Sequence, residues 1–269
     1  MDSTANVYIH PDRVAPRFRP LKAWFHMQKL IENKEDTEQV FRIIEALNGR
    51  SQVSNLEAFA ASETGHGLLQ RREYLPPLLD DHAWIRELPE GTVGRAYVDF
   101  MEREGLTAQG LVDESEKMRR GEAQYDDDLK WYGNRLRDTH DLFHVLTGYG
   151  RDALGEACLL GFTYSQNPGR GVIFIAFMAA RRLNRRLPKA ARAMDCLWEG
   201  KRNGRVAAKL IREDVIALLH EPIEAARERL DIRKPVTYLN ALKVCAEAGI
   251  AAADIQPGTQ TAKDEQVAA

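Results

Sequence analysis

Two histidines and two carboxylates lie close together near the middle of this 269-residue chain. His140, Asp141 and His144 fall within five residues, and Glu156 follows His144 after a spacer of eleven residues. Because each residue of a helix advances by about 100°, the first three side chains share one arc and can point at a common ion. The spacing therefore predicts a metal site.

The residues after His144 predict how a fourth ligand could arrive. Gly148 and Gly150 are suited to end a helix, and Asp152 is suited to cap the start of the next one. Glu156 would then lie in the first turn of that second helix. A helical hairpin of this kind can fold Glu156 back over the first helix to complete the ligand set.

The simpler alternative is a helix surface that binds no metal, since histidine pairs at this spacing also arise by chance. No Lys or Arg lies between Asp141 and Tyr149 to explain the acids by ion pairing.

A set of imidazoles and carboxylates suits Zn²⁺, Fe²⁺, Mn²⁺ or Co²⁺, and the lack of thiolates argues against a closed structural zinc site. Asp138 could orient a ligand imidazole, or could be a first-turn acid favoured by the helix dipole.

A second candidate site follows between residues 169 and 192, where an apolar helical stretch runs directly into a basic one. One interpretation is a buried core helix that ends in a solvated basic face. The other is a groove for an apolar tail, with arginines that meet anionic headgroups or a carboxylate. The residues of that groove would be Val172, Ile173, Phe174, Phe177, Met178, Arg181, Arg182 and Arg185.

The pattern His-Asp-x-x-His, then eleven residues, then Glu resembles the motif of the Coq4 family of ubiquinone (coenzyme Q) biosynthesis proteins. Weaker similarities follow in the family's order at residues 19–23, 35–41, 88–97, 167–169 and 198–230, the last with Pro222 and Arg227 as landmarks. The resemblance covers roughly residues 15–233, and Val215 departs from it where the family has an aromatic residue.

The resemblance implies a metal-dependent decarboxylase or oxidative decarboxylase that acts at ring carbon one of a polyprenylated hydroxybenzoate. It implies His140, Asp141, His144 and Glu156 as metal ligands and catalytic residues, with zinc as the first choice of metal and iron, manganese or cobalt as alternatives. A divalent ion in such a set acts as a Lewis acid on developing negative charge, whereas a step that uses oxygen favours a redox-active ion over zinc. The expected partners are the polyprenylated precursor, other ubiquinone-biosynthesis enzymes and a membrane surface, and a homodimer stays open.

Two rival functions remain. A non-catalytic organiser of a ubiquinone-biosynthesis complex would bind the metal and the lipid without turnover. An HD-type phosphohydrolase also uses a His-Asp doublet, but it needs a further upstream His and a downstream Asp and does not call for His144 with Glu156. Phosphate release would mark the phosphohydrolase, and tight lipid binding without turnover would mark the organiser.

The amino-acid composition limits the partners and the compartment that we expect for the protein. A net charge of −2 and a sequence pI near 6.4 give no overall attraction to nucleic acid. The three cysteines are odd in number and widely spaced, which favours a reducing compartment and no disulfide framework. The longest apolar run, residues 172–180, is far shorter than the roughly 20 residues of a membrane helix. We expect a cytoplasmic protein that associates peripherally with the inner face of the membrane.

Apolar residues recur at helical spacing, and alternating strand patterns are almost absent. The sequence predicts a single all-α domain of about eight to ten helices, with a central metal-binding helical hairpin whose first helix spans residues 137–146. Residues 21–31 and 37–47 predict two further helices, residues 207–219 a third, and Pro76 with Pro77 a turn. The expected organisation is an N-terminal extension (residues 1–14), the Coq4-like domain (15–233) and a C-terminal extension (234–269), disordered from about residue 257.

Overall fold

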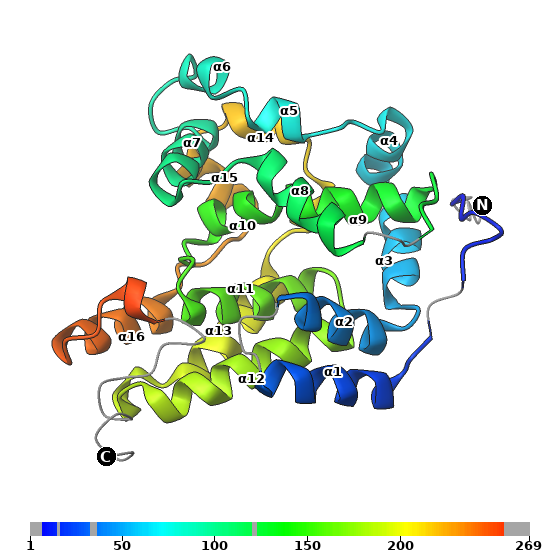
Figure 1. Cartoon of the computed structure of the whole chain (residues 1–269). Coiled ribbons are helices and arrows are strands. Elements are labelled where there is room, and N and C mark those ends of the chain that lie inside the picture. The colour runs from blue at the N-terminus through cyan, green and yellow to red at the C-terminus, as the bar shows by residue number, and fades with distance from the viewer. Residues whose placement is uncertain (1–6, 15–16, 33–36, 120–122, 256–269) are drawn as a thin grey trace. The chain divides into compact units, whose positions relative to one another are not determined.

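A computed structural model describes residues 7–14, 17–32, 37–119 and 123–255 (Figure 1). Across these ranges the regular structure is helical, and the only bridge of β type pairs Thr92 with Pro222. The predicted all-α class is confirmed. The chain forms two compact units, each assembled from segments that are distant in sequence. The first contains Met1–Ala15, Arg50–Thr147 and Ala207–Ile232, and the second Pro16–Gly49, Gly148–Val206 and Arg233–Ala269.

The first unit carries the His-Asp-x-x-His run on helix α10, which packs against α7, α9 and α15. Its core includes Leu56, Phe59 and Tyr132, all almost completely buried. The helices of this unit are α3 (Ser51–Ala60), α4 (Glu63–Arg71), α5 (Pro76–Leu79), α6 (His82–Arg86), α7 (Val93–Glu104), α8 (Ala108–Met118), α9 (Asp128–Asp138), α10 (His140–Thr147), η2 (Leu210–Arg212), α14 (Val215–His220) and α15 (Ile223–Arg229).

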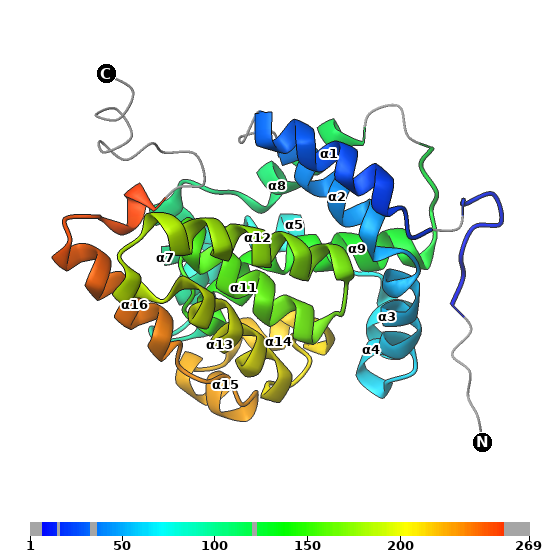
Figure 2. The same cartoon turned by 90° about the horizontal axis from the view of Figure 1, so that it is seen from below.

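The second unit is built around three long helices that pack side by side, α11, α12 and α13 (Figure 2). Helices α11 and α13 touch through backbone, since a Cβ at Gly200 would lie 2.2 Å from the carbonyl oxygen of Cys158 and one at Gly204 2.3 Å from that of Phe162. The helices of this unit are α1 (Pro20–Glu32), α2 (Thr37–Asn48), α11 (Ala153–Gln166), α12 (Arg170–Arg186), η1 (Lys189–Ala191), α13 (Ala193–Val206), α16 (Val236–Glu247) and η3 (Ala252–Asp254).

Both helix boundaries that the metal motif requires are present. Gly148 follows the end of α10 with φ of 76°, a conformation that strains residues with a Cβ. The Asp152 carboxylate accepts hydrogen bonds from the backbone N–H groups of Leu154 and Gly155 at 3.1 and 3.0 Å, and so caps α11. Glu156 lies in the first turn of α11, as predicted.

Four expectations about helices are wrong, beginning with their number. The described residues contain sixteen α-helices, because several are too short to show a hydrophobic period. Pro76 starts the short helix α5 instead of a turn, which a proline can do because a first-turn N–H needs no helical partner. The expected helix over residues 207–219 is divided, since Asp214 accepts from the N–H of Ala217 at 3.2 Å and caps a new helix, α14.

The expected helix over residues 137–146 is also divided, at Thr139. The Thr139 hydroxyl donates to the carbonyl oxygen of Arg135 at 2.8 Å, a bond that closes the last turn of α9. Asp138 therefore belongs to α9 and not to the helix of His140. The predicted disorder from about residue 257 lies outside the described residues. The division into residues 1–14, 15–233 and 234–269 stays a prediction.

Helix α1 does not bury the face that carries its largest apolar residues. Leu21, Trp24 and Phe25 recur at helical spacing, yet all three are exposed. The buried side of α1 instead carries Ala23 and Met27, which pack with Ile43 and Ala46 of α2. Small and flexible side chains thus make the helix contact, and the large ones face outward.

Arg227 of α15 secures the end of α10. Its Nε donates to the carbonyl oxygen of Leu146 and its Nη2 to that of Val145, both at 2.9 Å. These carbonyls belong to the last turn of α10, where the carbonyl oxygens have no N–H donors within the helix and where positive charge is favoured. We predict that Arg227→Ala lowers the free energy of unfolding by about 2 kcal/mol, measured by urea denaturation.

The matched control is Arg229→Ala on the same helix. Arg229 makes surface ion pairs with Glu213 and Glu221 at 2.7 and 2.8 Å, and pairs of that kind contribute up to roughly 1 kcal/mol. Equal effects of the two substitutions would contradict the assignment of Arg227 to the end of α10.

Candidate metal centre

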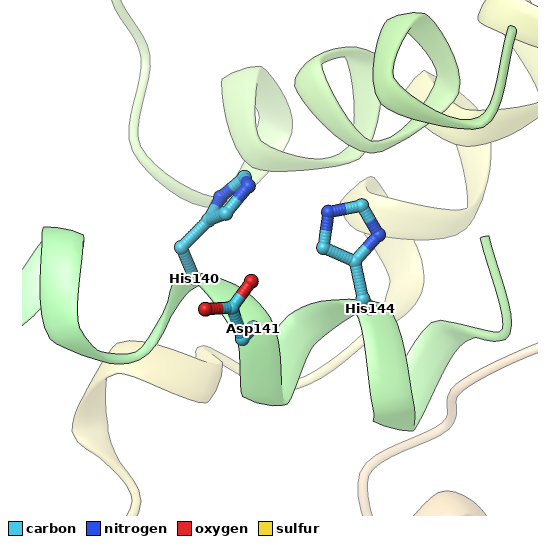
Figure 3. A group of neighbouring side chains, drawn as sticks. All are labelled: His140, Asp141 and His144. Atoms are coloured by element: carbon cyan, nitrogen blue, oxygen red, sulfur yellow. The ribbon is translucent and has the colours of Figure 1, made fainter. Parts of the chain in front are cut away.

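The structure brings His140, Asp141 and His144 together on α10. Each residue offers a ligand atom, and these atoms lie within 4.8 Å of one another. Figure 3 shows the three side chains rising from the same side of the helix. The imidazole rings of His140 and His144 are 4.9 Å apart between centroids and nearly perpendicular, at 89°. The predicted convergence of these three residues is therefore present.

Burial distinguishes the three side chains. His144 is 1% exposed and Asp141 7%, whereas His140 is half-buried. A buried carboxylate and imidazole are costly to desolvate unless they gain partners of opposite charge or a metal ion. His144 is thus shielded from solvent, whereas His140 is partly accessible. A small molecule would therefore reach an ion bound by these residues from the His140 side.

Helix α7 supplies the wall beside the cluster. The ring of Phe100 stacks on that of His144, with centroids 5.6 Å apart and planes at 21°. Tyr97 lies almost one turn earlier on α7, just as Asp141 lies almost one turn before His144 on α10. Tyr97 and Phe100 thus belong to the helix that packs against the helix of Asp141 and His144.

Tyr97 is the residue that sequence reasoning missed. It is 0% exposed, and its hydroxyl has no hydrogen-bond partner among the described residues. Burial raises the pKa of the phenol far above its ordinary value, and the charges of Asp141, Asp80 and Asp138 raise it further. Tyr97 closes the family-like stretch at residues 88–97, but nothing in its spacing indicated that it lies beside a metal motif.

Asp138 is buried at the end of α9 and pairs with Arg137, whose Nε and Nη2 both lie 2.7 Å from its Oδ1. Burial raises the pKa of the Asp138 carboxyl despite the opposing effect of Arg137. Asp138 also lines a cavity of about 320 Å³ in the first unit. The other lining residues are Arg72, Glu73, Tyr74, Asp126, Lys130, Trp131, Asn134 and Arg135.

Arg135 gives this cavity a buried positive charge. Its Nε and Nη2 donate to the carbonyl oxygens of Ile211 and Glu213, at 3.0 and 2.5 Å. Burial lowers the pKa of the guanidinium to about 10, which still leaves it charged at neutral pH. Trp131 lies beside it, with its ring 5.8 Å from the guanidinium carbon. The cavity therefore combines an aromatic wall with a cation whose hydrogen bonds, within the described part of the chain, go to backbone carbonyl oxygens.

Glu156 lies on α11 in the second unit and is half-buried. Its carboxylate is 3.8 Å from Nε of Arg151, a neighbour that the sequence analysis did not consider. The cluster of mutually close ligand atoms within the described residues contains three members, and Glu156 as the fourth stays a prediction.

The apolar and basic stretch of residues 169–192 forms α12 and the turn after it. Val172, Ile173, Phe174 and Phe177 are half-buried, and Met178 is 36% exposed. Phe174 packs against the hydrophobic cluster of α1 and α2, and Phe177 against the cluster of α11 and α13. Both side chains therefore contribute to the packing of the second unit. Arg181 and Arg185 are exposed and Arg182 is half-buried. The tail groove stays a prediction beside the core-helix interpretation.

The donor set of the α10 cluster fits a divalent transition metal. Two imidazoles and a carboxylate leave open positions on an ion that prefers four to six ligands, which is the arrangement of catalytic and not of structural sites. The ion itself is not part of the structure. The fold and the cluster together define an all-helical protein with a candidate catalytic metal centre.

Comparison with known proteins identifies the family. The family model described as coenzyme Q (ubiquinone) biosynthesis protein Coq4 matches residues 30–236. This chain therefore belongs to the Coq4 family, as the resemblance predicted. None of its described helices combines the length and hydropathy that a membrane span requires.

Individual relatives agree with this assignment. The mitochondrial ubiquinone biosynthesis protein coq4 of Sclerotinia sclerotiorum is 28% identical over 184 residues, which cover 67% of this chain and 61% of the relative. The Pyricularia oryzae protein is 31% identical over 134 residues, or 48% of this chain and 41% of the relative. The chain thus spans about 61% of the length of the first of these relatives. A crystal structure from Nostoc punctiforme has the same fold, with a TM-score of 0.61 at 23% identity over 81% of this chain and 100% of that one.

We predict that Tyr97→Phe separates metal binding from folding. Loss of a buried hydroxyl that has no partner leaves the free energy of unfolding of the metal-free protein unchanged or raises it by up to about 1 kcal/mol. An oxygen ligand on a bound ion would give that hydroxyl a partner, so the same substitution lowers Co²⁺ affinity by about tenfold or more. Urea denaturation with chelator and Co²⁺ titration provide the two measurements.

The control is Tyr132→Phe, which removes a buried hydroxyl from α9 in the same unit. It should leave Co²⁺ affinity unchanged. A clear loss of metal-free stability in Tyr97→Phe, with no change in Co²⁺ affinity, would show that the hydroxyl serves folding alone.

Proposed function

We propose that this protein acts on the head group of a polyprenylated hydroxybenzoate in ubiquinone biosynthesis, by decarboxylation or oxidative decarboxylation at ring carbon one. His140, Asp141 and His144 would hold the divalent ion, with Glu156 as the fourth ligand. The observation that carries the proposal is the buried His-Asp-His cluster in a chain of the Coq4 family. Zinc, by family resemblance, is the first choice of ion, and iron, manganese or cobalt are the alternatives.

The bound ion would supply Lewis acidity toward a carboxylate or phenolate oxygen of the substrate. His140 and His144 would hold the ion as neutral imidazoles, so the negative charge of the ligand set would come from the carboxylates of Asp141 and Glu156 alone. Burial of Asp141 and His144 would keep water away from the ion and so strengthen its interaction with a substrate oxygen. In the simple reaction the bond between ring and carboxylate breaks, carbon dioxide leaves and the ring carbon takes a proton. In the oxidative reaction the carboxyl group leaves as carbon dioxide, one atom of dioxygen becomes the ring hydroxyl, and a donor of two electrons with two protons reduces the other atom to water.

The first unit also contains the cavity lined by Trp131, Arg135 and Asp138. An aromatic wall and a buried guanidinium suit a flat anionic ring. We assign the isoprenoid tail to the apolar side chains of α12 from Val172 to Met178, with the arginines that follow toward lipid headgroups. The relatives are named as mitochondrial proteins, and for this chain we propose peripheral association with the inner face of a membrane, alongside other enzymes of the pathway.

A non-catalytic organiser is the second candidate function, because three of the four expected ligands are together and Glu156 has Arg151 as a neighbour. Such a protein would retain metal and prenyl lipid but release no carbon dioxide. Release of carbon dioxide from a polyprenylated hydroxybenzoate by metal-loaded protein decides between the two functions.

We predict that the double substitution His140→Ala, His144→Ala reduces bound metal to a small fraction of the wild-type content and abolishes carbon dioxide release. The reason is that two of the ligand side chains are removed from one turn of α10. Elemental analysis of purified protein gives the metal content, and circular dichroism establishes that both proteins are folded.

The control changes two exposed histidines, His66→Ala and His220→Ala, and should retain both metal and activity. Asp141→Asn serves as a ligand change of nearly equal volume, in case removal of the buried His144 ring disturbs packing. Stoichiometric metal in the folded His140→Ala, His144→Ala protein would reject the site.

We also predict that prenyl-lipid affinity depends on tail length. Each methylene-sized group removed from a buried tail weakens binding by up to roughly 0.8 kcal/mol. Ile173→Asp or Phe177→Asp should reduce tail binding more than metal content, measured in protein that circular dichroism shows to be folded. An affinity that stays constant as the tail is shortened would leave α12 as an ordinary packing helix.

A further inference from the structure

The outer face of α1 presents four large apolar side chains to solvent. Leu21 is 85% exposed, Trp24 64%, Phe25 55%, and Phe18, just before the helix, 51%. Because Leu21, Trp24 and Phe25 are spaced by three and four residues, they lie on one face. Contiguous exposed patches of this kind in soluble proteins mark surfaces that bind a partner or a membrane.

The exposure of this face does not result from poor packing of α1. The opposite side of α1 is buried through Ala23 and Met27, which are 4% and 6% exposed and pack with α2. Figure 2 shows α1 lying along α2. The fold of the second unit therefore uses one apolar face of α1 and leaves a second one without a partner among the described residues.

Positive charge surrounds the exposed face. Arg17, Arg19 and Lys29 are exposed and Lys22 is half-buried, and no Asp or Glu occurs between residues 17 and 31. Lys29 Nζ lies 4.6 Å from the centre of the Phe25 ring, and the Arg170 guanidinium lies 5.2 Å from that of Phe18. The acid that faces this helix from α2 is Glu45, 3.9 Å from Lys22. The rim thus keeps a clear positive excess.

We propose that α1 is a membrane-docking helix, which lies flat in the headgroup region of a bilayer with Leu21, Trp24 and Phe25 inserted and its basic rim against anionic phosphates. Aromatic and leucine side chains above a ring of Lys and Arg form the usual composition of interfacial helices. A second copy of this chain is a poorer occupant, because a twofold contact through this face would bring two basic rims together. The inference rests on the proposed function, whose substrate is dissolved in a membrane.

This assignment divides the membrane contact between two helices. Helix α1 provides insertion, since its large side chains already face solvent, whereas on α12 the apolar residues are half-buried and the exposed ones are mainly arginines. Arg181 and Arg185 can add electrostatic attraction without insertion. Changes to α1 should therefore weaken binding to every vesicle, and changes to Arg181 and Arg185 should weaken binding only to anionic ones.

The test is flotation of the full-length protein with vesicles of phosphatidylcholine, alone or with about one third phosphatidylglycerol, a fraction chosen to give strong surface charge. We expect Trp24→Ser with Phe25→Ser to lower the partition coefficient by about tenfold or more on both kinds of vesicle. Arg19→Glu with Lys29→Glu should remove the preference for phosphatidylglycerol. These side chains are exposed, so the substitutions leave the packed face of α1 intact.

The matched control is Tyr74→Ser with Val236→Ser, which removes two apolar side chains of similar exposure, 55% and 53%, from other helices and loops. It should float as wild type does. Equal flotation of the α1 variant and wild type, or no flotation of wild type, overturns the proposal. The proposal is also overturned if Trp24→Ser with Phe25→Ser converts an oligomer to a monomer and leaves flotation unchanged. That result would identify the α1 face as a contact between copies of this chain.

Metal content and carbon dioxide release are measured in detergent with a short-tailed substrate. These measurements test the proposed function independently of vesicle binding. The α1 variants should retain both. Vesicle binding through α1 without turnover would reject the enzyme and leave the docking helix in place. Turnover with flotation that ignores the α1 substitutions would reject the docking helix alone.

Discussion

Burial of the candidate ligands Asp141 and His144 is the constraint on which the packing around α10 depends. They are 7% and 1% exposed, and a helix with such residues facing inward is unstable unless its neighbours compensate. Phe100 provides a stacking surface for the His144 ring, and Arg227 satisfies carbonyls at the end of the helix. Helices α7 and α15 therefore stabilise the helix that carries the candidate site.

Helix α10 begins at His140, separated from the end of α9 by one residue, so Asp141 lies in its first turn. Thr139, between the two helices, keeps helical backbone angles, and its N–H and its hydroxyl both donate to the carbonyl oxygen of Arg135. A carboxylate in the first turn of a helix is favoured by the helix dipole. The turn at Thr139 thus places Asp141, a candidate ligand, where the start of a helix stabilises its charge.

The sequence was sufficient for the all-helical class, for the convergence of His140, Asp141 and His144, and for the cap at Asp152, because each depends on spacing within one or two turns. The sequence was insufficient where tertiary contacts determine the structure. The break at Thr139 competes with good helical periodicity on both sides, and short helices such as α5 have no period to detect. Tyr97 is 44 residues from Asp141 along the chain, and only the packing of α7 on α10 relates them.

Helix α1 shows why periodicity cannot by itself tell the inside of a protein from the outside. Two apolar stripes run along this helix, and hydrophobicity favours the one with leucine and aromatic residues as the core face. Packing selects the other, since Ala23 and Met27 let the backbone of α1 come close to α2, whereas Trp24 and Phe25 would hold the helices apart. Exposing the larger side chains costs stability in water, and burying them against a bilayer would recover that stability. The membrane contact proposed for α1 would provide this burial.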